Sequence, residues 1–366
     1  MGFQKIRTFH FRNLIDQVVD LSGRELFFVG ENGQGKTSFL EAIYLLSFGG
    51  SFRTSTDTLL VQHGQTQAAV EGYFVHETDG NGDDVLFKLE EDQSGTLKKE
   101  IRYNGKLIRD RREIVSAIPC IVFSHEDISF VTGPPERRRR FFNQTMSLHD
   151  PVFIDRLRRY EKVLRMRNRA LKERREDLVE VYDEELAASG LEIQLARIST
   201  TQEFNEVFAE LFLDISGLST ELSIHYLPAW RDCANPAAVL SHLSARRAAD
   251  ASLGATTSGP HRDRFLFSAG GRNFANVAST GQLRLASLIL RVAQALYFTR
   301  KTGRRPLLLL DDVLLELDLK RRERFLSRLP DADQRFFTFL PDEQFRPFVT
   351  PGTRIYHVVN GAILPS

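Results

Sequence analysis

The stretch FFVGENGQGKTSFLEAIYLL, residues 27–46, decides the fold. An apolar run ending at Val29 leads into a glycine-rich turn, and Lys36, Thr37 and an amphipathic helix follow. The turn satisfies the pattern G-x-x-x-x-G-K-[ST], in which glycines let backbone N–H groups cradle phosphate oxygens and the helix start adds positive potential. The stretch therefore predicts a P-loop that binds a nucleoside triphosphate. Its predicted nucleotide-binding residues are Gly30, Glu31, Asn32, Gly33, Gln34, Gly35, Lys36 and Thr37.

A second element supplies the acids that a P-loop needs for its metal ion. The run Leu307–Leu310 has the pattern of a buried parallel strand, and Asp311 and Asp312 follow it directly. We expect Thr37 and Asp311 to hold Mg²⁺, with Asp311 acting through water, and Asp312 to orient or deprotonate an attacking water. In the alternative interpretation, the two acids only cap the next helix.

A third element is STGQ at residues 279–282, where a predicted helix begins about thirty residues before the two acids. The Ser279 hydroxyl, the close approach allowed by Gly281 and the free N–H groups of a helix start together make an anion site. Any well-capped helix has a similar start, so this element is informative only together with the other two.

The chain divides into three parts by pattern. Residues 1–120 alternate β-rich runs with turns such as Gly80-Asn81-Gly82 and Asn104-Gly105, whereas residues 133–217 have helical periodicity. We expect the latter to form an antiparallel helix pair joined near Ser189-Gly190. The predicted fold is α/β, with an ATPase lobe built from residues 1–120 (P-loop) and 255–366 (signature and acids). A mainly helical lobe, residues 121–254, is inserted between them.

The composition excludes several classes of protein. The chain has 366 residues, 42% hydrophobic and 27% charged, as in an ordinary globular protein. Cys120 and Cys233 have no partners at metal-ligand spacing, which excludes a zinc site or a disulfide framework. No apolar stretch approaches the ~20 residues that span a bilayer, and the N-terminus lacks a signal-peptide pattern. We expect an intracellular, cytoplasmic protein.

The net charge of +1 conceals a local asymmetry. Residues 137–175 hold 14 Lys plus Arg against 4 Asp plus Glu, and residues 176–210 hold 1 against 10. One face could therefore meet a polyanion, or the two segments could form a helical pair joined by ion pairs. Charge alone leaves both interpretations open.

Along the chain, the P-loop, the S-x-G-Q element and the strand with its two acids follow one another in an order that resembles the heads of ABC-type ATPases, in which the signature of one subunit closes over nucleotide held by another. Further segments resemble the RecF family of DNA replication and repair ATPases, in the family's order and across nearly the whole chain. They are FRNL (11–14), GENGQGKTSFLEAIYLLSFGGSFRT (30–54), FSHEDISFVTGPPERRRRFFN (123–143), GPHRD (259–263) and STGQLRLASLIL (279–290).

The resemblance implies an ABC-type head that binds ATP and Mg²⁺, forms an ATP-dependent homodimer and acts in recombinational repair. It implies that Arg53 lies near the nucleotide and that Asp312 is the catalytic carboxylate. Four residues would face the partner subunit's nucleotide: Ser279, Gly281, Gln282 and Asp318.

The resemblance implies that the protein binds duplex, gapped or junction DNA without sequence preference. It also implies partners among other recombination mediators (RecR-like and RecO-like). Together with them, the protein would help to load the recombinase. The expected localisation is nucleoid-associated. The basic segment would contact DNA phosphates, because arginine binds phosphate oxygens bidentately. We expect some arginines of the run at 137–140 to be structural, since consecutive helix residues point to different faces. The candidates are Arg137, Arg138, Arg139, Arg140, Arg158, Arg159, Arg165 and Arg169.

Some positions depart from the patterns of the two families. Arg264 follows Asp263 where a second acid is frequent, and Asn143 stands where the RecF family usually has Asp. The histidine that transporters place after the next strand is missing from QRFFTFL, and SHED stands where a Q-loop glutamine is expected. We therefore expect slow hydrolysis, with ATP acting as a dimerisation switch. The role of residues 259–263 stays open between a structural loop and a contact near the nucleotide.

Three other classes compete with this interpretation. A transporter's nucleotide-binding subunit shares the phosphate chemistry, but the missing histidine and the basic segment count against it. An SMC-like coiled-coil protein would need a longer helical insertion. A small-molecule P-loop kinase has no need for the S-x-G-Q element.

Overall fold

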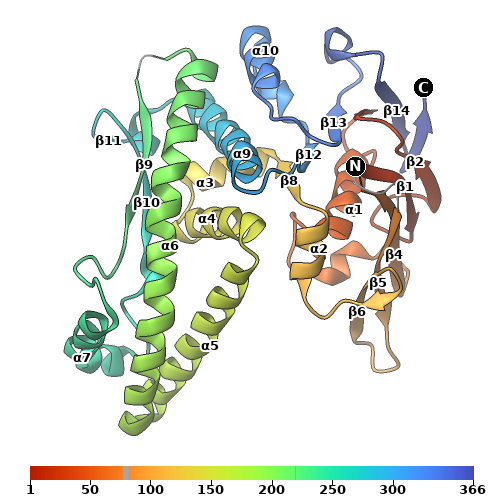
Figure 1. The fold of residues 1–366 in the computed structure, drawn as a ribbon. Helices are drawn as coiled ribbons and strands as arrows, with labels where there is room; N and C mark the ends of the chain where they lie inside the picture. Colours follow the sequence, from red (N-terminus) through yellow and green to blue (C-terminus); the bar gives the residue numbers. More distant parts are fainter. Residues whose placement is uncertain (77–81, 219) are drawn as a thin grey trace. The chain divides into compact units, whose positions relative to one another are not determined.

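The computed structural model describes residues 1–76, 82–218 and 220–366 (Figure 1). The chain forms two compact units: unit 1 is Met1–Glu126 with Phe298–Ser366, and unit 2 is Asp127–Tyr297. The second border differs from the expected one at residue 254, because the segment after it pairs with the inserted part of the chain. Strand β10 (Arg264–Ala269) joins β9 (Leu222–Leu227), and Asp263 forms an ion pair with Arg197. The predicted turn residues Gly80 and Asn81 lie outside the described residues.

Unit 1 contains a six-stranded, mostly parallel sheet in the order β15-β14-β3-β13-β12-β8. Only the edge strand β15 runs antiparallel to its neighbour. Strands β3 and β12 flank β13, so the loops that follow all three leave from the same edge of the sheet. The bounds are β3 Glu25–Val29, β8 Cys120–Phe123, β12 Leu307–Leu310, β13 Arg335–Phe339, β14 Thr353–Val359 and β15 Ala362–Pro365.

The second sheet of unit 1 is an antiparallel meander in the order β2-β1-β4-β5-β6-β7. The predicted turn Asn104-Gly105 joins its last two strands with φ angles of 50° and 75°, the left-handed values that these residues tolerate. The bounds are β1 Gly2–Phe9, β2 Gln17–Asp20, β4 Gln67–Val75, β5 Gly82–Glu91, β6 Leu97–Tyr103 and β7 Lys106–Leu107.

Helix α1 (Lys36–Phe48) connects the two sheets of unit 1. It contacts β4 and β5 of the meander and β8 and β13 of the parallel sheet, and its apolar residues share one core with both. Nearly every residue of α1 is buried, which fixes its N-terminus relative to the parallel strands. The other helices of unit 1 are α2 (Arg111–Ala117) and α10 (Leu319–Ser327), with 3₁₀ turns at Asp57–Leu60, His125–Ile128, Leu314–Glu316 and Arg346–Phe348.

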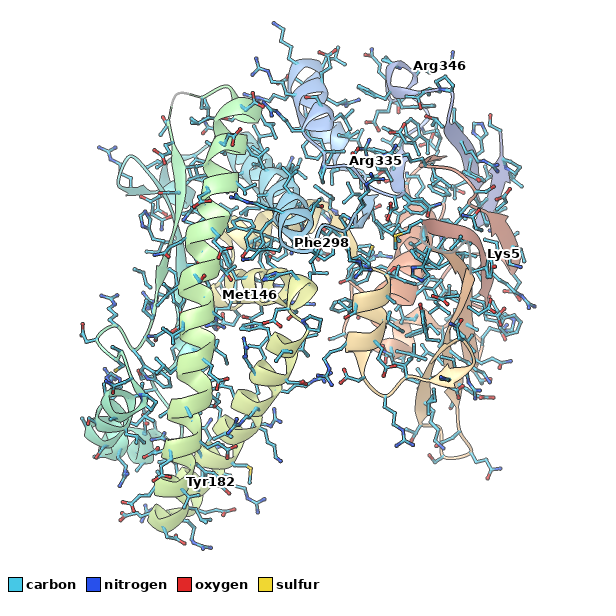
Figure 2. The ribbon with its side chains drawn as sticks, in the orientation of Figure 1. Lys5, Met146, Tyr182, Phe298, Arg335 and Arg346 are labelled. Atoms are coloured by element: carbon cyan, nitrogen blue, oxygen red, sulfur yellow. The ribbon has the colours of Figure 1, made fainter. Side chains whose placement is uncertain are left out.

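Unit 2 is mainly helical and gathers around α6 (Glu176–Ser216), with the three-stranded sheet β11-β10-β9 beside it (Figure 1). Figure 2 shows its side chains, with Met146 of α4 and Tyr182 of α6 labelled. The remaining elements are α3 (Ser129–Thr132), α4 (Pro135–His149), α5 (Val152–Glu173), α7 (Pro236–Leu253), α8 (Phe274–Val277), the 3₁₀ turn Pro260–Arg262 and β11 (Arg272–Asn273). Helix α9 (Thr280–Thr302) begins in this unit and ends in unit 1.

The prediction that a helix pair is joined at Ser189-Gly190 is wrong. The pair exists, but it consists of α5 and α6 and turns at Arg174, whereas α6 continues through Gly190. The glycine serves packing: a Cβ there would lie 2.6 Å from the Trp230 ring and 3.0 Å from that of Tyr160. A glycine in a helix interior thus marks a close approach here and not a turn.

Candidate nucleotide site and basic segment

The P-loop joins β3 to α1 in unit 1. Gly33 and Gly35 have φ angles of 79° and 116°, values that disfavour a side chain. Gly35 is the N-cap of α1 and provides no capping side chain, so the first N–H groups of the helix point toward an incoming anion.

Two other segments hold the P-loop in shape. From the FRNL loop, the Asn13 amide donates to Gly33 O at 2.9 Å and accepts from the Ser38 hydroxyl at 2.8 Å. From the turn between β14 and β15, the backbone N–H groups of Asn360 and Gly361 donate to the side chain and the carbonyl of Gln34. The FRNL motif therefore acts on the loop directly, and the Asn360-Gly361 turn, whose contact with the loop the sequence does not reveal, also supports it.

Lys36 lies inside the turn of the P-loop. Its side chain is 4% exposed, and its ammonium donates to Gly30 O at 2.7 Å and to Glu31 O at 3.3 Å. The nearest carboxylate oxygen is Oδ2 of Asp312, 3.8 Å away. The cation is thus held at the centre of the loop, beside the edge where the acids lie.

Thr37 and Asp311 come together across the edge of the parallel sheet. The Thr37 hydroxyl donates to Asp311 Oδ1 at 2.8 Å. Burial, together with the charge of Asp312, raises the pKa of Asp311 to about 6, against the lowering effects of Thr37, Arg53 and His125. A hydroxyl and a buried carboxylate are oxygen ligands that suit Mg²⁺, which takes few protein ligands and completes its shell with phosphate and water. Among the described residues no group of three His, Cys, Asp or Glu could form a metal site of its own.

Asp312 has an unusual backbone, with φ at 51°. Thr338 on β13 holds it there: the Asp312 N–H donates to the Thr338 hydroxyl at 2.7 Å, and that hydroxyl donates to Asp312 Oδ1 at 2.7 Å. A left-handed non-glycine residue persists only where its surroundings enforce it. Thr338 belongs to the stretch QRFFTFL, which lacks the transporters' histidine, and its contact with the acid is a feature that the sequence does not reveal.

Arg53 lies in the loop after α1, and its charge is one of those that favour the ionised form of Asp311. Its guanidinium lies 3.4 Å from Glu41, a fully buried carboxylate on α1 that the sequence interpretation did not single out. His125, from the SHED segment, is another residue whose charge reaches Asp311.

The signature residues lie at the start of α9 in unit 2. Ser279 Oγ accepts from Gln282 N–H at 3.3 Å, while the Gln282 side chain accepts from Ser279 N–H at 2.8 Å. This is a capping box, and Ser279 and Gly281 are exposed. In unit 1, Asp318 caps α10 by accepting from Arg321 N–H. Ser279, Gln282 and Asp318 thus have local capping roles, and Ser279 and Gly281 are exposed at the start of α9.

The basic segment divides into inward and outward arginines. In α4, Arg138 donates to the carbonyls of Val131 and Phe265, and Arg139 donates to that of Asp263, whereas Arg137 and Arg140 are exposed. The expectation that part of the run is structural is confirmed.

Most candidates in α5 are paired with acids. Arg158 pairs with Asp155, Arg159 with Glu185 and Arg169 with Glu173, while Arg165 is exposed and has no ion pair among the described residues. Ion pairs therefore account for much of the charge asymmetry.

The GPHRD segment is built into unit 2. The Tyr160 hydroxyl donates to His261 Nδ1 at 2.7 Å, and Nε2 donates to Thr256 O at 3.0 Å. Burial lowers the pKa of His261 to about 4. Asp263 is fully buried and pairs with Arg197 at 2.7 Å. These contacts give the segment a structural role, the first of the two alternatives.

Comparisons with known proteins agree with this architecture. Residues 3–359 match the family model RecF/RecN/SMC N terminal domain. The chain is 40% identical to the DNA replication and repair protein RecF of Treponema pallidum over 96% of this chain and 98% of the relative, and 31% identical to that of Leptospira interrogans (serovar Lai) over 93% and 92%. A solved structure of the recombination mediator protein RecF with ATP, in the RecFOR pathway, has a TM-score of 0.89 and 29% identity, covering 100% of this chain and 97% of that one. An Smc head shares the fold, with a TM-score of 0.56 at 16% identity. The predicted ABC-type head fold is confirmed.

Proposed function

Because the chain belongs to the RecF family, we propose that it is an ATP-controlled DNA-binding protein of recombinational DNA repair and replication. ATP acts as a switch: its binding joins two copies of the chain on DNA, and its slow hydrolysis releases them. The protein acts in the cytoplasm on chromosomal DNA. Its partners are gapped or duplex DNA and other recombination mediators, in keeping with a structural relative described as part of the RecFOR pathway.

One observation supports nucleotide binding above all: the contact of Thr37 with Asp311, beside the buried Lys36. The P-loop N–H groups and Lys36 bind the phosphates, and Thr37 and Asp311 would hold Mg²⁺ beside them. When bound, Mg²⁺ neutralises phosphate charge and orients the γ-phosphate.

Asp312 supplies the base for hydrolysis. It follows Asp311 at the edge of the sheet, and Thr338 fixes its carboxylate. Asp312 orients a water for attack on the γ-phosphate and accepts its proton, while the bond from the γ-phosphorus to the β–γ bridging oxygen breaks and ADP leaves. An aspartate reaches less far than the glutamate that transporters use, which agrees with slow turnover and a switching role.

The signature residues act in a second copy of the chain. Ser279 and Gly281 are exposed at the start of a 23-residue helix, where N–H groups and the helix dipole favour an anion. The γ-phosphate held by one copy is therefore the ligand for Ser279, Gly281 and Gln282 of the other, with Asp318 close to the same interface.

The DNA contacts fall to the arginines that have no acid partner within the described residues: Arg137, Arg140 and Arg165. Their exposed guanidinium groups fit phosphate oxygens, so binding is independent of sequence and sensitive to salt. Arg138 and Arg139, whose donors are used inside the unit, make no DNA contact. Arg158, Arg159 and Arg169 contribute less because an acid already neutralises each.

The size of the protein in solution tests the switch. The molar mass of the Asp312→Asn variant is measured by light scattering after size exclusion, with ATP or ADP and Mg²⁺. This variant is used because it does not hydrolyse the bound ATP. We expect a dimer with ATP and a monomer with ADP. Ser279→Arg in the same background binds ATP but stays monomeric, and Lys36→Ala loses both nucleotide and dimer.

A monomer under every condition, with ATP bound, would contradict the role of the signature and leave Ser279 as a helix cap. It would favour the small-molecule kinase. Copurification with a membrane protein would favour the transporter subunit. Among the described residues, no helix has the length and apolarity to cross a bilayer.

A further inference from the structure

One buried carboxylate in unit 1 links two motifs whose roles the P-loop does not explain. Glu41 lies on α1, four residues after Thr37 and therefore on the same face of the helix, and its side chain is 0% exposed. Arg12 of the FRNL motif and Arg53 of the SFRT motif both contact it. A buried carboxylate is stable only when it is paired and hydrogen-bonded, so this cluster is a built arrangement.

The two arginines are bound unequally. Arg12 is 18% exposed and makes two hydrogen bonds, Nε to Oε2 at 2.9 Å and Nη2 to Oε1 at 2.8 Å. Arg53 is 39% exposed and makes one long contact, Nη1 to Oε2 at 3.4 Å. Arg12 is therefore the fixed counter-ion of Glu41, whereas most of the five donors of Arg53 remain for another oxygen ligand.

The loop that carries Arg53 is attached to the same carboxylate. The Ser51 hydroxyl donates to Glu41 Oε1 and accepts from the backbone N–H groups of Arg53 at 2.9 Å and Thr54 at 3.0 Å. This turn fixes the backbone at Arg53, so Glu41 determines where the guanidinium lies through both the loop and the side chain.

The charge of the cluster and its position point to phosphate. Two guanidinium groups and one carboxylate leave a net charge of +1, and Glu41 lies one helical turn after Thr37, whose hydroxyl contacts Asp311. The unsatisfied positive charge thus faces the edge of the sheet where the metal and the γ-phosphate are expected.

We infer that Glu41 is a positioning residue for ATP: it holds Arg53, through its carboxylate and through Ser51, within reach of the γ-phosphate, while Arg12 keeps the carboxylate neutralised. This inference rests on the proposed binding of ATP at the P-loop. It gives the FRNL and SFRT motifs one shared role, the placement of a cation that distinguishes a triphosphate from a diphosphate.

A double-mutant cycle tests the inference. The dissociation constants of ATP and ADP with Mg²⁺ are measured for the wild type, Arg53→Ala, Glu41→Gln and the double variant. Because it removes a hydrogen bond between charged groups, Arg53→Ala should weaken ATP binding about tenfold, or about 1.4 kcal/mol, and ADP binding much less. Glu41→Gln should weaken ATP binding about fivefold, and this loss should disappear in the Arg53→Ala background.

The controls separate positioning from stability. Glu25→Gln breaks the Arg335–Glu25 pair, in which both side chains are 19% exposed and Glu25 is the first residue of β3, at the end opposite the P-loop. It should leave ATP affinity unchanged. Ser51→Ala keeps the carboxylate paired with Arg12 and should reproduce part of the Glu41→Gln loss, so the test survives if Glu41→Gln does not fold.

Two results would overturn the inference: an equal loss from Glu41→Gln with and without Arg53, or an equal loss for ATP and ADP. Either would make Glu41 a structural residue of α1. The failure of ATP binding in the wild type, or its persistence in Lys36→Ala, would instead contradict the proposed function.

Discussion

The sequence predicts a site for a polyanion both at the P-loop edge of unit 1 and in the basic segment of unit 2. The two regions differ in how many of the predicted residues the structure leaves available to bind one. At the P-loop edge, Lys36, Thr37, Asp311 and Asp312 are in contact as the motifs predict. In the basic segment, Arg138, Arg139 and Arg167 turn into the unit. Others pair with acids on the surface.

The difference follows from how each site is encoded. A P-loop is fixed by local spacing, because backbone N–H groups bind the phosphate and glycines allow the turn. A charge run has no such geometry, since successive helix residues point in different directions and each can meet an acid from another helix. Motif spacing therefore predicts contacts, whereas charge density predicts only a tendency.

Asp312→Asn should give the largest effect and tests the P-loop side of the comparison. Removing a general base costs roughly 10²–10⁴-fold, so we expect turnover to fall about 1,000-fold, or about 4 kcal/mol, in steady-state ATP hydrolysis. ATP affinity should not weaken. A loss below tenfold would show that another group activates the water, and Asp110→Asn, at the N-cap of α2, serves as the control at a helix cap.

The pH dependence of stability tests the interior of unit 2. The pKa of His261 is lowered to about 4, so the unfolded chain, with its ordinary value near 6.5, takes up the proton first as the pH falls. Stability should therefore be lost between about pH 6.5 and 4, by up to about 3 kcal/mol.

Trp230, the only tryptophan of the chain, is buried in this unit and reports its unfolding in urea. The slope of the unfolding free energy against pH reports how many protons the chain takes up on unfolding. His261→Gln should lower this number by about one, whereas His63→Gln, at an exposed site, should leave it unchanged. Equal slopes in all three proteins would mean that His261 is not held neutral by its surroundings.

Thr338→Val tests whether the Thr338 hydroxyl positions Asp312 at the P-loop edge. The substitution keeps the shape of the side chain and removes both hydrogen bonds to Asp312. We expect turnover to fall about tenfold with little change in ATP affinity, as the loss of one positioning hydrogen bond implies. Thr338→Ser should restore most of the rate. Rescue would assign the effect to the hydroxyl, and an equal loss in both variants would assign it to packing.

The smallest expected effect distinguishes the exposed arginines of the basic segment from those that pair with acids. Changing Arg137 and Arg140 together to Ala should weaken duplex binding about fivefold. The slope of the logarithm of the binding constant against the logarithm of the salt concentration should become shallower by about two, because each contact to a phosphate contributes about one to that slope. Changing Arg158 and Arg169 together, each of which has an acid partner, should weaken binding less than twofold. Equal losses would show that total charge matters more than the pairing.

The sequence could predict the fold class and the contacts of the P-loop edge, because both depend on short-range spacing. It could not predict Glu41 or Thr338, since their roles arise only when α1 and β13 are packed beside distant segments. The sequence indicates a turn at Gly190, because the close approach of a glycine to an aromatic ring leaves no local signal. Arg197 and Asp263 likewise meet only in the folded unit.

The central claim is that ATP at the P-loop controls binding to DNA. The most direct test is fluorescence anisotropy of labelled duplex DNA, with and without ATP and Mg²⁺, for the wild type and Lys36→Ala. The account predicts that ATP tightens binding by the wild type and that the variant loses this gain while keeping its weak, salt-sensitive binding. Affinity that is the same with and without ATP, or absent even at low salt, would contradict it.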